Sequence, residues 1–200
     1  MSQFAAHVAL GVLAFRTLMS AIVTSSGVFN ASQSFIMDGH TRLTDYVLQS
    51  VARSAFDFLT GLPVLVVALA MYGTVSLVGL LLAVPLLFLI YLNVFWIGVA
   101  FALIGARFPD FGQVLSNIST FLFLLTPIIW YVDSVPPGSL RARFMVLNPL
   151  FHFVELFRMP VLDGTVPLQS LWVVLAMTGA GLGLATLLYR RYARFVPLWI

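Results

Sequence analysis

The sequence predicts an all-α integral membrane protein with about five transmembrane helices. Hydrophobic residues make up 61% of the 200 residues and charged residues only 8%, against roughly 25% charged residues in a soluble domain. Several apolar runs reach the roughly 20 residues that a helix needs to cross a bilayer. Charges and prolines gather between these runs. A single membrane domain over residues 1–200 is the simplest organisation.

The first predicted span covers residues 4–28. It is not a signal peptide, because no positive region precedes it and no small-residue cleavage site ends a short apolar core. Arg16 interrupts this span, and a charge inside a membrane usually faces a partner or a water-filled cavity. Arg16 either lines a polar path or pairs with a carboxylate such as Asp57. Alternatively, the span begins later and the Arg16 side chain reaches the outer interface.

The segment after the first span is polar, but apolar side chains recur in it at helical spacing between Phe35 and Val47. This periodicity predicts an amphipathic helix. We place it at residues 32–49, lying along the membrane surface.

The second and third spans are predicted at residues 55–72 and 76–104. The third is long enough to require tilt or a bend, and Pro85 supplies a kink site. A tight polar loop at residues 107–110 leads to the fourth span.

The fourth predicted span, residues 114–132, has two contrasting faces at 100° per residue. The first face carries hydroxyl and aromatic side chains, and the opposite face is aliphatic. Such a face suits a conduit for sugars, because rings stack on pyranoses and hydroxyls exchange hydrogen bonds. Alternatively, the hydroxyls bond their own helix backbone and the last rings belong to an interfacial belt. The members of the first face are Ser116, Ser119, Thr120, Phe123, Thr126, Pro127 and Trp130.

Residues 133–169 leave regular spanning structure. Asn148 is placed to cap a helix that has Pro149 at its first position. This helix is predicted to run to about residue 158 and to dip into the outer membrane interface. The apolar side chains that share one of its faces are Leu150, Phe153, Val154 and Phe157.

His152 and Glu155 stand one turn apart in this helix, as metal or acid/base partners do. A polar face on an interfacial helix explains them better, with Glu155 pairing with Arg158 at i, i+3.

The last span is predicted at residues 171–189. Small residues form a ridge along it that permits close helix approach. Packing inside one subunit is favoured over a dimer seam. The ridge consists of Ala176, Gly179, Ala180 and Gly183.

Arginines near the span ends predict the orientation. The side that holds the C-terminus carries six, and the opposite side carries Arg141, Arg143 and Arg158. The side with six arginines is predicted to be the cytoplasm. Its six arginines are Arg42, Arg53, Arg107, Arg190, Arg191 and Arg194.

Composition also excludes some functions. The chain has no lysine, so it cannot hold ATP through a Walker A loop, and any ATP and Mg²⁺ would belong to a partner chain. The arginines form no stripe, which argues against nucleic acid. No convergent nucleophile and base is visible, so the chain itself is predicted to be no enzyme. The alternative, a membrane-embedded envelope-assembly enzyme, is disfavoured by the scattered positions of His7, His40 and His152.

Three strings occur in order between the apolar segments: ARFPDF at 106–111, TPIIWY at 126–131 and NPLFHFVELFRMP at 148–160. In this membrane context they resemble ABC-2 type exporter permeases. The ending RRYARFVPLWI, residues 190–200, resembles the branch that exports lipid-linked polysaccharides, including O-antigen. Such permeases have six spans, and residues 9–15 resemble the region after the first of them. The chain is therefore expected to lack an N-terminal interfacial helix and the first span.

The resemblance implies several roles. The 32–49 segment would be the coupling helix that docks into a separate ATPase; resting on lipid headgroups is the alternative. The fourth span would border the translocation path, and residues 133–169 would form a periplasmic helical re-entrant region. The candidate coupling residues are Phe35, Met37, Asp38, Arg42, Arg107 and Asp110. The candidate path residues are Ser116, Thr120, Phe123, Thr126, Trp130 and Tyr131, with Arg16 as an intramembrane charge.

The predicted function is that of the permease of a two-component exporter in the bacterial inner membrane, with a cytoplasmic C-terminus. It would act as a homodimer with an ABC ATPase among membrane lipids, moving an O-antigen-like lipid-linked polysaccharide outward without a cofactor of its own. The alternative is an ABC-2 permease for another cargo, such as teichoic acid, a drug or a lipid.

Overall fold

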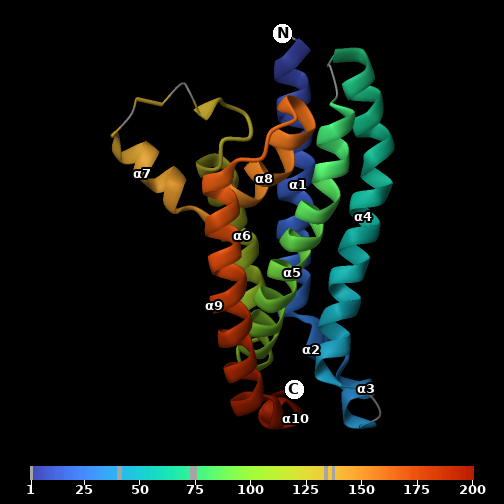
Figure 1. Ribbon diagram of the computed structural model, residues 1–200. Coiled ribbons are helices and arrows are strands. Elements are labelled where there is room, and N and C mark those ends of the chain that lie inside the picture. Colours follow the sequence, from blue (N-terminus) through green and yellow to red (C-terminus); the bar gives the residue numbers. More distant parts are fainter. Residues whose placement is uncertain (1, 40–41, 73–75, 133–134, 137) are drawn as a thin grey trace.

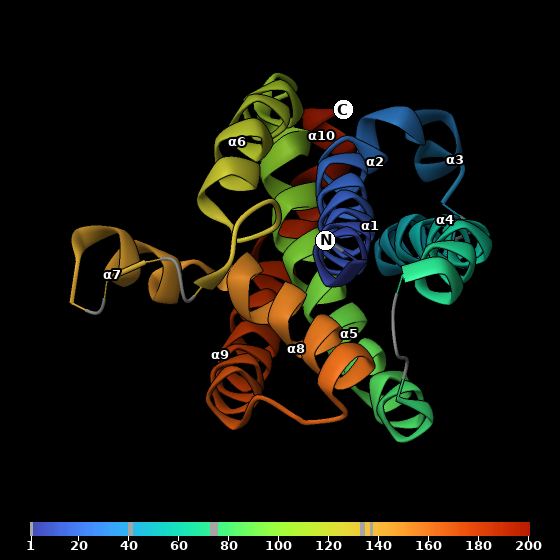
Figure 2. The ribbon, with the colours of Figure 1, turned by 90° about the horizontal axis from the view of Figure 1, so that it is seen from above.

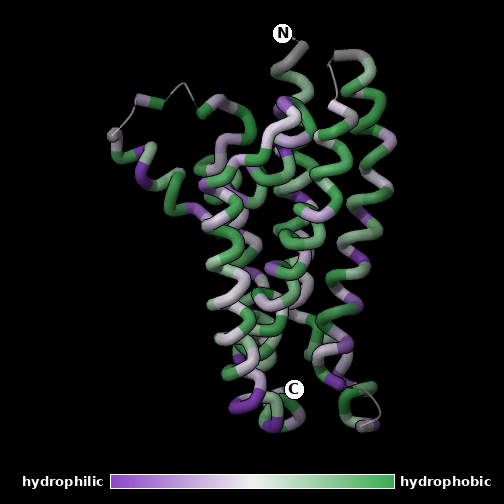
Figure 3. The backbone as a smooth tube through the Cα atoms, in the orientation of Figure 1, coloured by the Kyte–Doolittle hydropathy of each residue, from purple (hydrophilic) through white to green (hydrophobic). Residues whose placement is uncertain are grey.

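A computed structural model describes residues 2–39, 42–72, 76–132, 135–136 and 138–200. Four long helices form a bundle (Figure 1): α1 (Ser2–Ser26), α4 (Leu43–Tyr72), α5 (Leu77–Arg107) and α9 (Leu168–Tyr192). Each of the four contains an apolar stretch long enough to cross a membrane. Apolar residues occur along the whole length of the bundle (Figure 3). The predicted all-α membrane fold is confirmed.

Shorter helices complete the molecule. They are α2 (Val28–Ala31), α3 (Gln33–Met37), α6 (Phe111–Leu125), α7 (Leu140–Leu147), α8 (Pro149–Asp163) and α10 (Val196–Trp199), with a 3₁₀ turn at Ala193–Phe195. Figure 2 shows α1 and α5 at the centre, with α4, α6, α8 and α9 around them. The helix α1 packs against α4, α5, α6 and α8.

The predicted amphipathic helix at residues 32–49 is wrong. Helix α3 ends at Met37, and Gly39 follows with φ +72°, a conformation that commonly ends helices. Helix α4 then starts at Leu43 and continues without interruption through the second predicted span. The apolar spacing in the second half of the segment is therefore the start of a transmembrane helix.

The fourth predicted span is also wrong in its extent, because α6 ends at Leu125 rather than near residue 132. A helix of 15 residues is about 22 Å long, which is less than the roughly 30 Å of a bilayer core. The cause is Pro127, which disfavours helical backbone at the preceding residue. Thr126 is extended, with φ −81° and ψ 135°.

The helices α7 and α8 are bent by 78° relative to each other, as in a broken span or a re-entrant loop. Asn148 caps α8 by accepting a hydrogen bond from the Leu150 N–H, and Pro149 is its first residue, as predicted. The helix is longer than predicted, however, and it is buried on nearly all sides among α1, α5 and α9. It therefore belongs to the bundle rather than to the interface.

The small-residue ridge of α9 is not packed inside the subunit, contrary to prediction. A Cβ added at Gly179 or Gly183 would meet no atom of the described chain within 4 Å, and Ala176 and Ala180 are exposed. The inner face of α9 carries Gly181, where an added Cβ would lie 2.1 Å from the Trp96 ring.

Candidate functional site

A groove of about 490 Å³ runs between α1 and α6. Because α1 and α6 are joined through the up-and-down path of α4 and α5, they run in opposite directions (Figure 1). The groove brings together side chains about a hundred residues apart in the sequence. Its lining consists of Val12, Phe15, Arg16, Met19, Ser20 and Val23 from α1, with Ser116, Ser119, Thr120 and Phe123 from α6.

Aromatic contact fixes one part of the groove. The rings of Phe15 and Phe123 meet edge to face, with centroids 5.3 Å apart, an arrangement that adds about 0.5–1.5 kcal/mol to the burial of the rings. Phe123 remains partly exposed to the groove. Its ring therefore both joins α6 to α1 and lines the open space.

Of the groove hydroxyls, only that of Ser119 forms a hydrogen bond within the described chain. The Ser119 hydroxyl donates to the Ser116 carbonyl oxygen at 2.6 Å, the backbone bond that the alternative interpretation expects. The hydroxyls of Ser20, Ser116 and Thr120 bond to no other group of the described chain. These three hydroxyls can exchange hydrogen bonds with a ligand.

Arg16 lies in the same groove, although its sequence position does not connect it with the α6 hydroxyls. It stands ten residues before the end of α1 at Ser26, which is about 15 Å of helix and near the middle of a bilayer. A charge at that depth costs roughly 2.5–3.5 kcal/mol on insertion scales. The apolar stretch of α1 runs from Phe4 to Ser26, and Arg16 stands near its middle.

The suggested pairing of Arg16 with Asp57 does not occur. Asp57 is exposed on α4, and Arg16 forms no ion pair with any acidic side chain in the described residues. The arginine therefore faces the groove without a counter-ion from the described part of the chain.

The remaining path candidates lie outside this groove, because α6 ends before them. Thr126 is fully buried. Trp130 is partly exposed, and the Arg141 guanidinium lies 4.2 Å from its ring centroid. Tyr131 packs with its ring centroid 4.4 Å from that of His7. The prediction of a single helical stripe through residue 130 is therefore wrong. Only its members up to Phe123 line the groove together.

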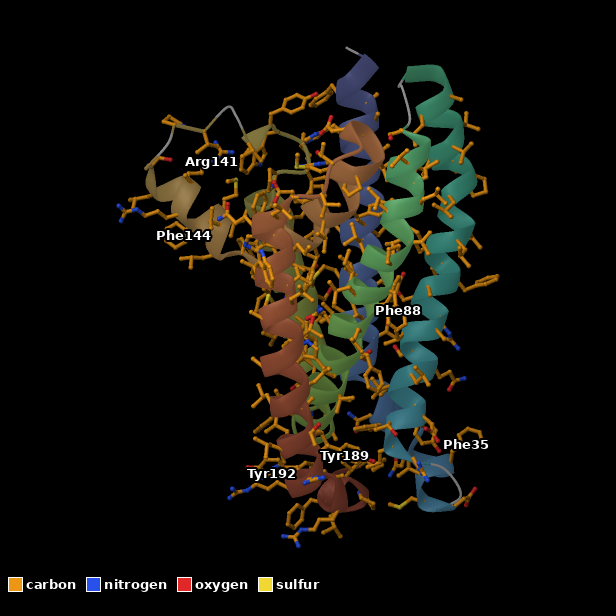
Figure 4. The ribbon with its side chains drawn as sticks, in the orientation of Figure 1. Phe35, Phe88, Arg141, Phe144, Tyr189 and Tyr192 are labelled. Carbon is orange, nitrogen blue, oxygen red and sulfur yellow. The ribbon has the colours of Figure 1, made fainter. Side chains whose placement is uncertain are left out.

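The six coupling candidates are all exposed at the end of the bundle that carries α3 and α10. Phe35 and Met37 on α3 are 65% and 54% exposed, and Figure 4 shows Phe35 at the same end of the bundle as Tyr192 and far from Arg141. Arg107 ends α5 and Asp110 precedes α6. Asp38 directly precedes Gly39, and Arg42 directly precedes α4.

This end is held together by close contacts. The Asn30 side chain on α2 donates to the Gly105 carbonyl oxygen on α5 at 3.0 Å. A Cβ at Gly105 would lie 1.8 Å from the Ser26 carbonyl oxygen. The turn from α1 into α2 and α3 is therefore fixed against the end of α5. A force on α3 can reach the bundle through this contact.

Comparison with known protein families identifies the family of this chain. A family profile described as ABC-2 type transporter matches residues 3–162. The chain belongs to the ABC-2 type transporter family. No curated protein matches the chain. Membership makes it the membrane subunit of a transporter and implies that this ABC-2 subunit pairs with an ABC ATPase.

The local sequence of this ABC-2 subunit does not indicate the contacts that the Arg158 side chain makes. The Arg158 side chain is 4% exposed, and its Nη1 donates to the Pro127 carbonyl oxygen at 2.7 Å and to His7 Nε2 at 2.9 Å. The Asn148 side chain also donates to the Thr126 hydroxyl at 2.8 Å. These bonds tie α8 to α1 and to the end of α6.

Glu155 and Arg158 form no direct ion pair in the described part of the chain, although the Glu155 charge still acts on Arg158 from a distance. Glu155 instead accepts a hydrogen bond from the Ser170 hydroxyl at the start of α9. Ser170 Oγ also lies 2.9 Å from His152 Nδ1, and His152 Nε2 donates to the Val146 carbonyl oxygen at 2.8 Å. His152 is 2% exposed, so His152 and Glu155 join α8 to α7 and α9 instead of forming a polar surface.

Proposed function

We propose that this ABC-2 subunit exports an O-antigen-like lipid-linked polysaccharide across the bacterial inner membrane. It would act as a homodimer with two copies of a separate ATPase, which would bind ATP and Mg²⁺. The observation that supports this cargo most is the groove between α1 and α6. Free hydroxyls and a partly exposed ring line it at the depth of a membrane span.

The groove chemistry suits a sliding glycan. Aromatic faces contact the apolar faces of sugar rings, and the hydroxyls of Ser20, Ser116 and Thr120 can bond to sugar hydroxyls. None of these contacts is strong alone, since a neutral hydrogen bond contributes a net of about 0.5–1.5 kcal/mol. A chain can therefore pass along the groove without becoming trapped.

Charge distribution supports a cytoplasmic C-terminus. Arg42, Arg107 and three tail arginines are exposed at the end that carries α10, and Arg53 lines a groove at that end. Arg158 no longer counts for the opposite end, because it is buried in the bundle. Only Arg141 and Arg143 remain there, which increases the arginine asymmetry that supports a cytoplasmic C-terminus.

The α3 surface suits a docking site for the ATPase. Phe35 and Met37 present apolar side chains beside Asp38, and the short helix is held against α5 through α2. Closure of the ATPase dimer on ATP would push α3 and, through the α1–α2 turn, part the two permeases along the groove.

Surface labelling of a strain that lacks this gene tests the proposed cargo. Cells without the subunit should keep lipid-linked polysaccharide inside, and the subunit with its ATPase should restore polysaccharide at the surface. A catalytically inactive ATPase should not restore it. Normal surface polysaccharide in the deletion strain would contradict this cargo and favour another substrate.

A further inference from the structure

Arg16 is the only charged residue among those that line the α1–α6 groove, all of which the structure describes. The neighbouring lining residues are hydroxyl or apolar. An uncompensated cation at this depth raises the cost of the empty groove and attracts an anion from the membrane. The charge of the groove therefore complements an anionic ligand rather than a neutral one.

The donors that line the groove with Arg16 fit a phosphate. A guanidinium offers several N–H groups in a planar fork that matches phosphate oxygens. The hydroxyls of Ser20, Ser116 and Thr120 line the same groove and have no bond within the described chain. Together they provide three further donors. The hydroxyls can serve sugars as well, but the positive charge of Arg16 favours an anionic group over a neutral one.

The rest of the lining fits a hydrocarbon chain. Val12 and Phe15 lie on the N-terminal side of Arg16, and Met19 and Val23 lie on its C-terminal side. An amphiphile that enters from the membrane can place its phosphate at Arg16 and its chain along these apolar residues. The combination of one cation, several hydroxyls and flanking apolar side chains is typical of a site for a lipid phosphate.

We propose that Arg16 binds the phosphate group of the lipid-linked glycan halfway across the membrane. The inference rests on the proposed function, because it names the part of that cargo which the groove recognises. A phosphate that crosses hydrocarbon loses its hydration, and pairing with Arg16 offsets part of this penalty. Ordinary anionic phospholipids carry the same group, and the experiment separates the two sources.

Lipid binding to the purified subunit tests this inference. The protein is placed in phosphatidylcholine nanodiscs with a polyprenyl diphosphate, the matching polyprenol or phosphatidylglycerol, and bound lipid is counted by native mass spectrometry. We expect wild-type protein to prefer the diphosphate to the polyprenol by about tenfold or more, as hydrogen bonds to a charged group allow. Arg16→Gln should abolish the preference and Arg16→Lys should retain part of it.

Two controls keep the result interpretable. Arg190→Gln removes an exposed arginine at the end of α9 and should leave the preference unchanged. The double variant Ser116→Ala, Thr120→Val keeps Arg16 and should weaken diphosphate binding severalfold, which provides a second test if Arg16→Gln does not fold.

An unchanged diphosphate preference in Arg16→Gln or, where that variant does not fold, in the double variant overturns the inference. Equal binding of phosphatidylglycerol overturns it too, because the site would then be a general anionic-lipid site. Neither result bears on the proposal that the cargo is a lipid-linked polysaccharide. That proposal fails instead if the deletion strain still displays polysaccharide, whatever the nanodisc measurement gives.

Discussion

Arg158 shows how one side chain can connect three segments of the bundle. Its guanidinium lies among α8, the start of α1 and the segment after α6, where it reaches His7 and the Pro127 carbonyl. Burial of a charge is costly unless its donors are satisfied. Here at least two acceptors bind it, so Arg158 holds α8 at a defined position in the bundle.

Arg158→Met tests this role at the scale of one residue. The methionine preserves an unbranched apolar chain, but it leaves the Pro127 carbonyl and His7 without their donor, which costs about 1–3 kcal/mol for each buried group left unpaired. The midpoint of thermal unfolding in detergent should fall clearly. The control Arg143→Met changes an exposed arginine on α7 and should shift the midpoint little. Equal midpoints would show that Arg158 is not a structural anchor.

At the scale of elements, apolar length predicted α1, α5 and α9, and N-cap and proline signals predicted the start of α8. The errors arose where a helix-breaking residue interrupted an apolar periodicity that predicted one longer helix. Pro127 ends α6, and the turn at Gly39 ends α3 before α4 begins. Contacts between distant elements could not be predicted. His7 and Arg158 are 151 residues apart, and nothing in either local sequence indicates the other.

Two glycines of α9 provide a matched test of helix packing. Gly181→Ala places a Cβ against the Trp96 ring, whereas Gly179→Ala meets nothing within 4 Å. The first variant should lose roughly 1–3 kcal/mol of stability through overpacking, and the second should be neutral or slightly stabilising, since alanine favours helix. Thermal unfolding of both variants measures the difference. Destabilisation by Gly179→Ala alone would mean that α9 packs in another orientation.

Phe35→Asp tests the docking role of α3. Because Phe35 is 65% exposed, the substitution should leave folding and membrane insertion intact but prevent the apolar contact with the ATPase. Co-purification of the ATPase and export should both drop. Gln33→Asp adds the same charge to the same helix without removing an apolar side chain, and it should be tolerated. Normal ATPase binding by Phe35→Asp would rule out docking through this residue.

At the scale of the whole molecule, hydrophilic residues are concentrated at the end that holds α3 and α10 (Figure 3), and α7 projects from the bundle near the opposite end (Figure 1). The coupling candidates and α7 therefore lie near opposite ends of the bundle. If the first end faces the cytoplasm, the groove between α1 and α6 lies mainly in the half of α1 nearer the docking side.

Thiol labelling in intact spheroplasts measures this orientation, and the chain has no cysteine to interfere. Ser34→Cys and Leu198→Cys should resist a membrane-impermeant maleimide, whereas Phe144→Cys should react. All three positions are exposed, so accessibility to solvent does not limit the reaction. Labelling of Leu198→Cys from outside would reverse the proposed topology.

Polysaccharide export by two tryptophan variants of α6 tests the central claim most directly. Thr120 lies in the groove, whereas Ile118 is 43% exposed on α6 but is not among the groove residues. The bulky ring in Thr120→Trp should fill the groove and remove most export per folded complex, while Ile118→Trp should export like wild type. If Thr120→Trp exports normally, or if only Ile118→Trp loses export, the α1–α6 groove is not the path of the cargo.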